Sequence, residues 1–153
     1  MGTLDEPALT PPEARDLRRL AGIMIPADDT YGVPGADDPS IFGDILKTLG
    51  RDMADVKIAL AALSGLAGGS FGDLDDAGAE TAAMRLLAEP ARAVLALGRV
   101  VLSAYYRDGR VMRSLGREPR PPFPKGHPLP DGDWSLLDAV RGRPPLWRDH
   151  RRA

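Results

Sequence analysis

Along the first 115 positions of the chain, apolar residues recur at steps of three and four, which predicts helices. The segment Thr10-Pro11-Pro12-Glu13 has the form of a helix start, with threonine as the cap, proline in the first turn and glutamate three residues after the cap. We expect six helices, over residues 11–25, 39–50, 53–64, 76–87, 91–107 and 110–115. No run alternates apolar with polar residues over the length of a strand. We therefore expect an all-α fold, a compact bundle of about five to six helices.

The fifth of these helices, ARAVLALGRVVLSAYYR, is the most apolar. Its polar residues fall on one narrow stripe, which consists of Arg92, Arg99, Ser103 and Arg107. We therefore expect this helix to be buried on most of its sides, at the centre of the bundle. Of the two tyrosines that close it, Tyr105 and Tyr106, we expect one ring to pack inward and the other outward.

The character of the chain changes at Gly116. The next stretch, REPRPPFPKGHPLPDGDW, carries six prolines in 18 residues and is incompatible with a helix. Only DWSLLDAVR, residues 133–141, is expected to add a short helix, capped by Asp133. The sequence thus predicts a helical domain over residues 1–116 and an extended Pro/Arg-rich C-terminal arm over residues 117–153 with one short helix.

Composition removes several classes of site and segment. The 153 residues include no cysteine, which excludes disulfides, thiolate zinc sites, iron–sulfur clusters and covalently attached c-type haem. No window approaches 18 apolar residues, so we expect no membrane insertion. The start, MGTLDEPALTPPEARD, has neither an Arg-Arg pair nor a following apolar run, and so gives no sign of a secretory or twin-arginine signal. We expect a cytoplasmic protein; a periplasmic location would require that the signal is on a partner or was removed.

Charge is divided unevenly along the chain. Residues 1–106 hold 9 Lys and Arg against 16 Asp and Glu, whereas residues 107–153 hold 11 against 6. A basic tail on an acidic body indicates that the tail meets something other than solvent. Prolines and acidic residues interrupt the basic ones, so we expect no nucleic-acid partner, although a nucleic-acid-binding module remains an alternative. Tryptophan and arginine dominate protein interfaces, which favours a protein partner over a segment that only wraps its own bundle.

The stretch IMIPADDTYGVPGADD, Ile23 to Asp38, holds two pairs of aspartates. A calcium loop needs alternating oxygen ligands and a later glutamate, and this spacing lacks both. Asp37 or Asp38 is placed to cap the helix that begins at Pro39, and Asp28 to close an Asx turn after Pro26. We interpret the aspartates as caps and turns; a small helical metal-binding protein that uses this loop is the alternative.

The remaining motifs are weaker. Glycines between Gly65 and Gly72 lack the spacing of a phosphate-binding loop and follow no strand. His127 has no serine, cysteine or second histidine near it in sequence. We interpret it as a hydrogen-bonding histidine at a packed surface, and we expect no catalytic residue, metal ligand or cofactor in this chain.

Two stretches are similar to a known family. LRRLAGIMIPADDTYGVPGADD, Leu17 to Asp38, resembles the opening of the small, or gamma, subunit of gluconate 2-dehydrogenase-type flavoenzymes. The segment from Tyr105 to Gly116, continued by GDWSLLDAVRGRPPLWRD, resembles the ending of one branch of these subunits. The resemblance covers both ends of the chain, and the middle matches only as helices.

The resemblance implies a non-catalytic partner in a heterodimer. Such small subunits accompany a large FAD-binding dehydrogenase of the glucose–methanol–choline type, which oxidises sugars or other alcohols, and they help it mature. FAD is then expected in the partner, and a cytochrome c subunit is a further partner that the resemblance allows. Many members carry a twin-arginine signal, which this sequence lacks.

We expect the residues that contact the partner to lie in the aspartate loop, at the end of the fifth helix and along the arm. In the arm, Phe123, Trp134 and Trp147 are expected to fill pockets, and Arg120, Arg141 and Arg148 to pair with acidic groups. The full predicted set is Tyr31, Tyr106, Arg120, Pro122, Phe123, His127, Trp134, Arg141, Trp147 and Arg148.

Overall fold

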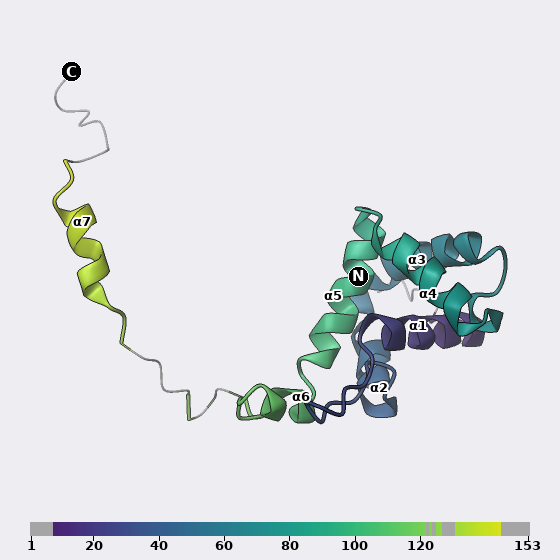
Figure 1. The fold of residues 1–153 in the computed structure, drawn as a ribbon, viewed down its shortest axis with the longest axis horizontal. Coiled ribbons are helices and arrows are strands. Elements are labelled where there is room, and N and C mark those ends of the chain that lie inside the picture. Colours follow the sequence, from purple (N-terminus) through teal and green to yellow (C-terminus); the bar gives the residue numbers. More distant parts are fainter. Residues whose placement is uncertain (1–7, 122, 124, 127–130, 145–153) are drawn as a thin grey trace, which may run out of the picture. The chain divides into compact units, whose positions relative to one another are not determined.

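The structure, a computed structural model, describes residues 8–121, 123, 125–126 and 131–144. The chain divides into two units, Met1–Pro119 and Arg120–Ala153, called the bundle and the arm from here on. Over the described residues the secondary structure is helical, with seven α-helices and no strand (Figure 1). The predicted all-α fold class is confirmed.

Six α-helices form the bundle. They are α1 (Pro11–Met24), α2 (Pro39–Thr48), α3 (Met53–Ala67), α4 (Asp76–Leu87), α5 (Arg92–Tyr105) and α6 (Gly109–Ser114). Two short 3₁₀ turns, η1 (Gly50–Asp52) and η2 (Phe71–Asp73), connect α2 to α3 and α3 to α4.

The helices begin where the sequence places their caps. The Thr10 hydroxyl accepts a hydrogen bond from the Glu13 N–H, and the Glu13 carboxylate accepts one from the Thr10 N–H at 2.7 Å, which completes the predicted capping box. Asp75, rather than Asp76, caps α4 by accepting from the Gly78 N–H at 2.8 Å. These local bonds satisfy N–H groups that have no partner within the helix.

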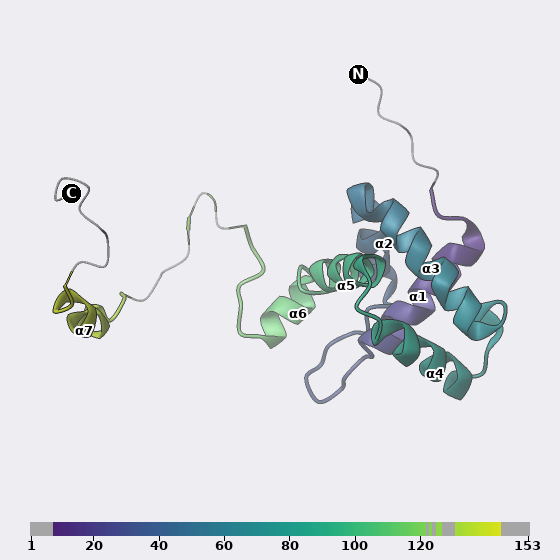
Figure 2. The same ribbon diagram turned by 90° about the horizontal axis from the view of Figure 1, so that it is seen from above.

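One hydrophobic core lies among the helices of the bundle. In Figures 1 and 2, α3 packs against α4 on one side and against α5 on the other, and α2 also packs against α5. The largest fully buried side chains are Phe71, Leu17, Leu20, Ile41, Ile45, Leu49, Leu63, Leu86, Leu97, Val56 and Val101.

The structure corrects the expectation for α5. Its buried face carries Val94, Leu97 and Val101, but Leu95 and Leu102 are exposed. The reason is that α5 packs mainly on α2 and α3, which cover one side of it. The helix therefore lies at an edge of the bundle and not at its centre. The prediction for the two tyrosines is confirmed, because Tyr105 is buried and Tyr106 exposed.

The predicted polar stripe of α5 forms ion pairs with its neighbours. Each of its three arginines meets an aspartate of the segment from α2 to α3, and these pairs are Arg92–Asp55, Arg99–Asp52 and Arg107–Asp44. The arginines of the stripe thus lie along the border of the face that α5 packs against α2 and α3, each next to an aspartate of that segment.

A second polar contact fixes η2 beneath α1. The Arg19 guanidinium donates hydrogen bonds to the carbonyls of Phe71, Gly72 and Leu74 at 3.1, 3.1 and 2.7 Å. The Asp16 carboxylate accepts from the Gly72 N–H at 3.0 Å. These bonds satisfy the backbone of a turn whose phenylalanine is wholly buried.

The described part of the arm contains two short helical segments, η3 (Trp134–Leu137) and α7 (Asp138–Arg141). Asp133 caps the first of them, as predicted, by accepting from the Ser135 N–H at 3.1 Å. Among the described arm residues none is buried. Within the described parts of the chain, no helix has the length and apolar character needed to cross a membrane.

Candidate partner-binding surface

The loop between α1 and α2 is a tight hairpin-like turn. Asp28 and Val33 exchange two backbone hydrogen bonds of 3.0 Å, and the Ala36 N–H donates to the Ile25 carbonyl at 2.9 Å. The Asp28 carboxylate accepts from the N–H groups of Thr30 and Tyr31, which is the predicted Asx turn. The loop is therefore ordered by its own backbone, and it presents Tyr31 at its tip with 70% of that residue exposed.

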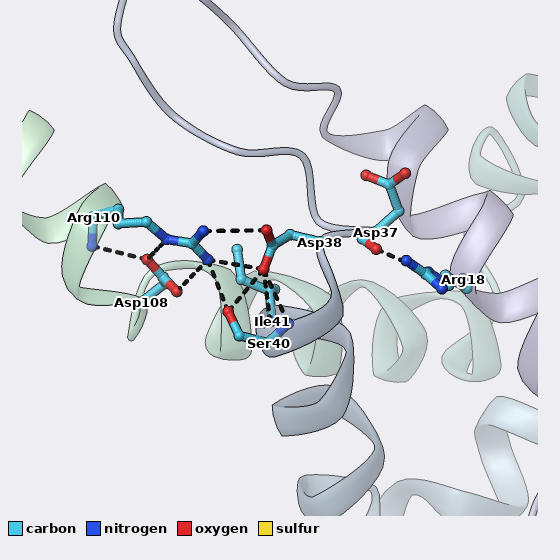
Figure 3. Close-up of polar contacts among 7 residues, drawn as sticks. All are labelled: Arg18, Asp37, Asp38, Ser40, Ile41, Asp108 and Arg110. Atoms are coloured by element: carbon cyan, nitrogen blue, oxygen red, sulfur yellow. Dashed lines mark hydrogen bonds and ion pairs between the residues drawn. The ribbon is translucent and has the colours of Figure 1, made fainter.

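The second pair of aspartates closes the loop onto the helices. Asp38 caps α2 by accepting from the N–H groups of Ser40 and Ile41, so the predicted capping role is confirmed for Asp38. The Asp37 carbonyl accepts from Arg18 Nε at 2.9 Å, while its carboxylate points away from that guanidinium (Figure 3). A Cβ on Gly35 would overlap the Asp37 carboxylate and stand 3.0 Å from the Ala27 backbone nitrogen, which favours glycine at that position.

Arg110, at the start of α6, joins α6 to the end of the loop (Figure 3). Its guanidinium donates to the Asp38 carboxylate at 2.8 and 3.1 Å, to the Asp108 carboxylate at 2.9 and 3.0 Å, and to the Ser40 hydroxyl at 2.8 Å. The guanidinium holds the pKa of Asp38 well below its usual range and also lowers the pKa of Asp108. We call this cluster of Asp38, Ser40, Asp108 and Arg110 the arginine lock.

Next to the arginine lock, the loop and the segment from α5 to α6 enclose a largely apolar groove of about 450 Å³. The Ser114 hydroxyl donates to the Tyr31 carbonyl at 3.2 Å and so links the two walls. The lining residues are Ile25, Pro26, Ala27, Asp28, Tyr31, Val33, Tyr105, Tyr106, Val111, Ser114 and Leu115.

The groove combines a buried floor with exposed apolar walls. Tyr105 and Val111 are buried, and burial raises the pKa of the Tyr105 phenol. Tyr106 packs edge-on against Tyr105, with ring centroids 5.4 Å apart, yet 54% of Tyr106 is exposed. Leu115, which directly follows the short helix α6, is 59% exposed. An apolar surface of this kind is suited to an aromatic or aliphatic side chain of a partner.

The structure brings together two residues of the predicted partner-binding set, Tyr31 and Tyr106, as walls of one groove. Sequence reasoning missed Ser114 and Leu115. The available signal was Leu115, the apolar residue at the end of RVMRSL. It follows the last turn of the predicted helix and so is not needed at a core position.

In the arm, Phe123 and Trp134 are 83% and 68% exposed. Arg120 donates to the carbonyls of Pro121 and Gly126, and Arg141 pairs with Asp138 at 3.1 Å. Both arginines thus have contacts within the arm, whereas their predicted pairing with a partner stays a prediction. Pro122, His127, Trp147 and Arg148 lie outside the described residues.

The described residues contain no group of three or more histidine, cysteine, aspartate or glutamate side chains with the arrangement of a metal site. Comparison of the chain with protein-family models, curated proteins and solved structures finds no match. Function is therefore inferred from the residues and their geometry, together with the resemblance of the two stretches described above.

Proposed function

We propose that this chain is the non-catalytic small subunit of a heterodimer, and that it binds and stabilises a large FAD-dependent dehydrogenase of sugars or other alcohols. In this proposal FAD and the catalytic residues belong to the large subunit. The small subunit contributes a preformed surface that assists maturation of the flavoprotein.

One observation carries the proposal. All the residues that line the groove come from the two stretches with the family resemblance, Leu17–Asp38 and Tyr105–Gly116. The stretches are separated by more than sixty residues in sequence, yet they meet at a single exposed apolar surface. A shared binding surface would account for the resemblance of both stretches to subunits that bind a partner.

The construction of the groove also fits a binding role. Tyrosine is enriched among the residues that dominate binding energy, and two exposed tyrosines flank this groove. The arginine lock and the Ser114–Tyr31 hydrogen bond hold the walls in place before a partner arrives. Preorganised walls lose less conformational entropy on binding, which favours affinity.

Co-expression tests the proposal. The chain would be produced together with a glucose–methanol–choline-type flavoprotein from the same genome, and the flavoprotein would also be produced alone. We expect soluble, FAD-loaded and active flavoprotein only when this chain is present. If the flavoprotein is equally soluble, loaded and active without it, the proposal is wrong.

A pair of variants connects that result to the groove. Tyr31→Ala together with Tyr106→Ala is expected to weaken the complex by well over about 30-fold, because truncating even one interface anchor commonly costs about 2 kcal/mol. Met84→Ala on α4 is the matched control, since Met84 is also an exposed apolar residue of the bundle but lies away from the groove. Equal weakening by both variants would show that the groove is not the binding surface.

A further inference from the structure

The floor of the groove between the α1–α2 loop and α6 carries the hydroxyl of Tyr105. This residue is 6% exposed and lines the groove. Within the part of the chain that the structure describes, no residue exchanges a hydrogen bond with the hydroxyl. Its oxygen is nevertheless not among the described polar atoms that are sealed from solvent. Because the groove is the open space that Tyr105 lines, the hydroxyl is reached from the groove.

The surroundings of this hydroxyl carry negative charge. Burial raises the pKa of the Tyr105 phenol, and Tyr106, Asp108 and Asp28 act in the same direction. Asp108 is paired with Arg110, whereas the Asp28 carboxylate accepts only from backbone N–H groups among the described residues. A carboxylate or phosphate in the groove would therefore be repelled. A neutral N–H or O–H group would instead present the positive end of its dipole to the phenol oxygen.

An occupant of the groove has to replace the water that reaches this hydroxyl. The volume of about 450 Å³ and the mostly apolar lining suit one aromatic group. An occupant without a hydrogen-bonding group would leave the hydroxyl buried and unsatisfied, which lowers affinity. The apolar walls thus accept the body of the occupant, and Tyr105 selects for its polar end.

We propose that the groove binds an uncharged aromatic group with an N–H donor, the indole of a tryptophan on the partner, and that the Tyr105 hydroxyl accepts the hydrogen bond from that N–H. Indole has a donor and no acceptor, which suits an oxygen in negative surroundings, whereas the phenol of a tyrosine brings a second oxygen. A lysine or arginine would lose its hydration among apolar walls. This inference rests on the proposed function and specifies the chemistry of the partner's anchor.

A pair of small ligands tests the site on the full chain without any partner. Indole and 1-methylindole share one aromatic body, but only indole has the N–H. We expect indole to bind at least about fivefold more tightly, because 1-methylindole leaves the Tyr105 hydroxyl unsatisfied. Titration followed by amide NMR signals measures both affinities, and the shifts should lie in residues 25–33 and 105–115.

A substitution that removes only the hydroxyl identifies the group responsible. Tyr105→Phe should reduce the preference for indole to about onefold or less, and Ser103→Ala, which removes a hydroxyl from the same helix away from the groove, should keep it. Tyr105→Phe should also leave the Tm within about 3 °C of the wild type, since no described group depends on the hydroxyl. A larger fall in Tm would show that the hydroxyl is bonded inside the folded chain and would overturn the proposal.

The co-expressed flavoprotein tests whether a partner supplies the indole. Tyr105→Phe should weaken the complex at least about fivefold, and saturation with the flavoprotein should exclude free indole from the groove. Tighter binding of free indole by the full chain with Trp134→Ala and Trp147→Ala would show that the chain itself supplies the indole, which would overturn the assignment to a partner.

The outcomes separate the two proposals. If the flavoprotein does not bind the wild-type chain, the proposed function fails, and the assignment of the indole to a partner fails with it. If the flavoprotein binds but the chain binds indole and 1-methylindole equally, or Tyr105→Phe keeps the preference, only the inference about the anchor is overturned.

Discussion

The bundle and the arm use their large apolar side chains in opposite ways. In the bundle, Phe71 has no exposed surface and the helices bury one connected set of leucines, isoleucines and valines. In the described part of the arm, Phe123 and Trp134 are both exposed, and no side chain is buried. Folding of the bundle accounts for its own apolar residues, whereas the described part of the arm has no core of its own. Substitutions of apolar residues in the bundle are therefore expected to change stability, and substitutions of apolar residues in the arm are expected to change association with a partner.

A pair of identical substitutions tests this difference most strongly. Phe71→Ala should lower the free energy of unfolding by about 3–5 kcal/mol, because it leaves a cavity in the core. Phe123→Ala should change it by less than about 0.5 kcal/mol, since that ring is exposed. Urea unfolding followed by circular dichroism measures both, and similar losses would mean that the arm contributes to the folded core.

At the end of α5, one of two adjacent tyrosines is expected to contribute to stability and the other to binding. Tyr105→Ala should lower the unfolding free energy by about 3 kcal/mol, since that ring is buried. Tyr106→Ala should cost at most about 1 kcal/mol, the size of its edge-on ring contact. Thermal and urea unfolding give the stabilities, and titration with the flavoprotein should show about 30-fold weaker binding for Tyr106→Ala. A larger loss of stability for Tyr106→Ala than for Tyr105→Ala would contradict the assignment of Tyr105 to the floor of the groove and of Tyr106 to its wall.

A third pair separates the two aspartates that end the loop. Asp38→Ala should destabilise the bundle by about 1–2 kcal/mol, because it removes the cap of α2 and leaves Arg110 with one carboxylate fewer. Asp37→Ala, next to it in sequence, should cost less than about 0.5 kcal/mol. Urea unfolding at pH 7 measures the difference, and equal losses would show that capping and the arginine lock do not stabilise the fold.

The smallest effect is a dependence of stability on pH. The pKa values of Asp38 and Asp108 are lowered in the folded chain by Arg110, relative to about 3.9 in the unfolded chain. The contribution of the two carboxylates to the free energy of unfolding is therefore complete above the unfolded pKa, and it is lost as the pH falls towards the folded pKa. In Arg110→Gln the loss of stability from pH 7 to pH 3 should be smaller than in the wild type by no more than about 1 kcal/mol. Arg113→Gln, on the same helix, should leave the loss unchanged; an unchanged loss in Arg110→Gln would contradict the lock.

Local features of the fold could be predicted from the sequence. Thr10, Asp28, Asp38, Asp75 and Asp133 act on N–H groups two or three residues away, so the sequence alone contains both the cap or turn residue and its target. The helices follow from the same local signals together with apolar spacing. Contacts between distant segments could not be read in this way.

The candidate site depends on such distant contacts. Tyr31 and Tyr106 could each be named from the sequence, but not their meeting in one groove, because that depends on how the loop packs beside α6. The pairing of Arg110 with Asp38 spans 72 residues. The exposure of Leu95 and Leu102 was missed for a related reason, since apolar spacing shows that a helix has core positions but not how many neighbours surround it.

The central claim is that the partner covers the groove on the bundle and contacts the arm, where the other predicted contact residues lie. Amide hydrogen exchange of the full chain, alone and in complex with the flavoprotein, tests it most directly. Protection should increase in three segments, residues 25–33, 109–115 and 134–141, and should stay unchanged in α4. Protection of α4 with no change in those three segments would contradict the account.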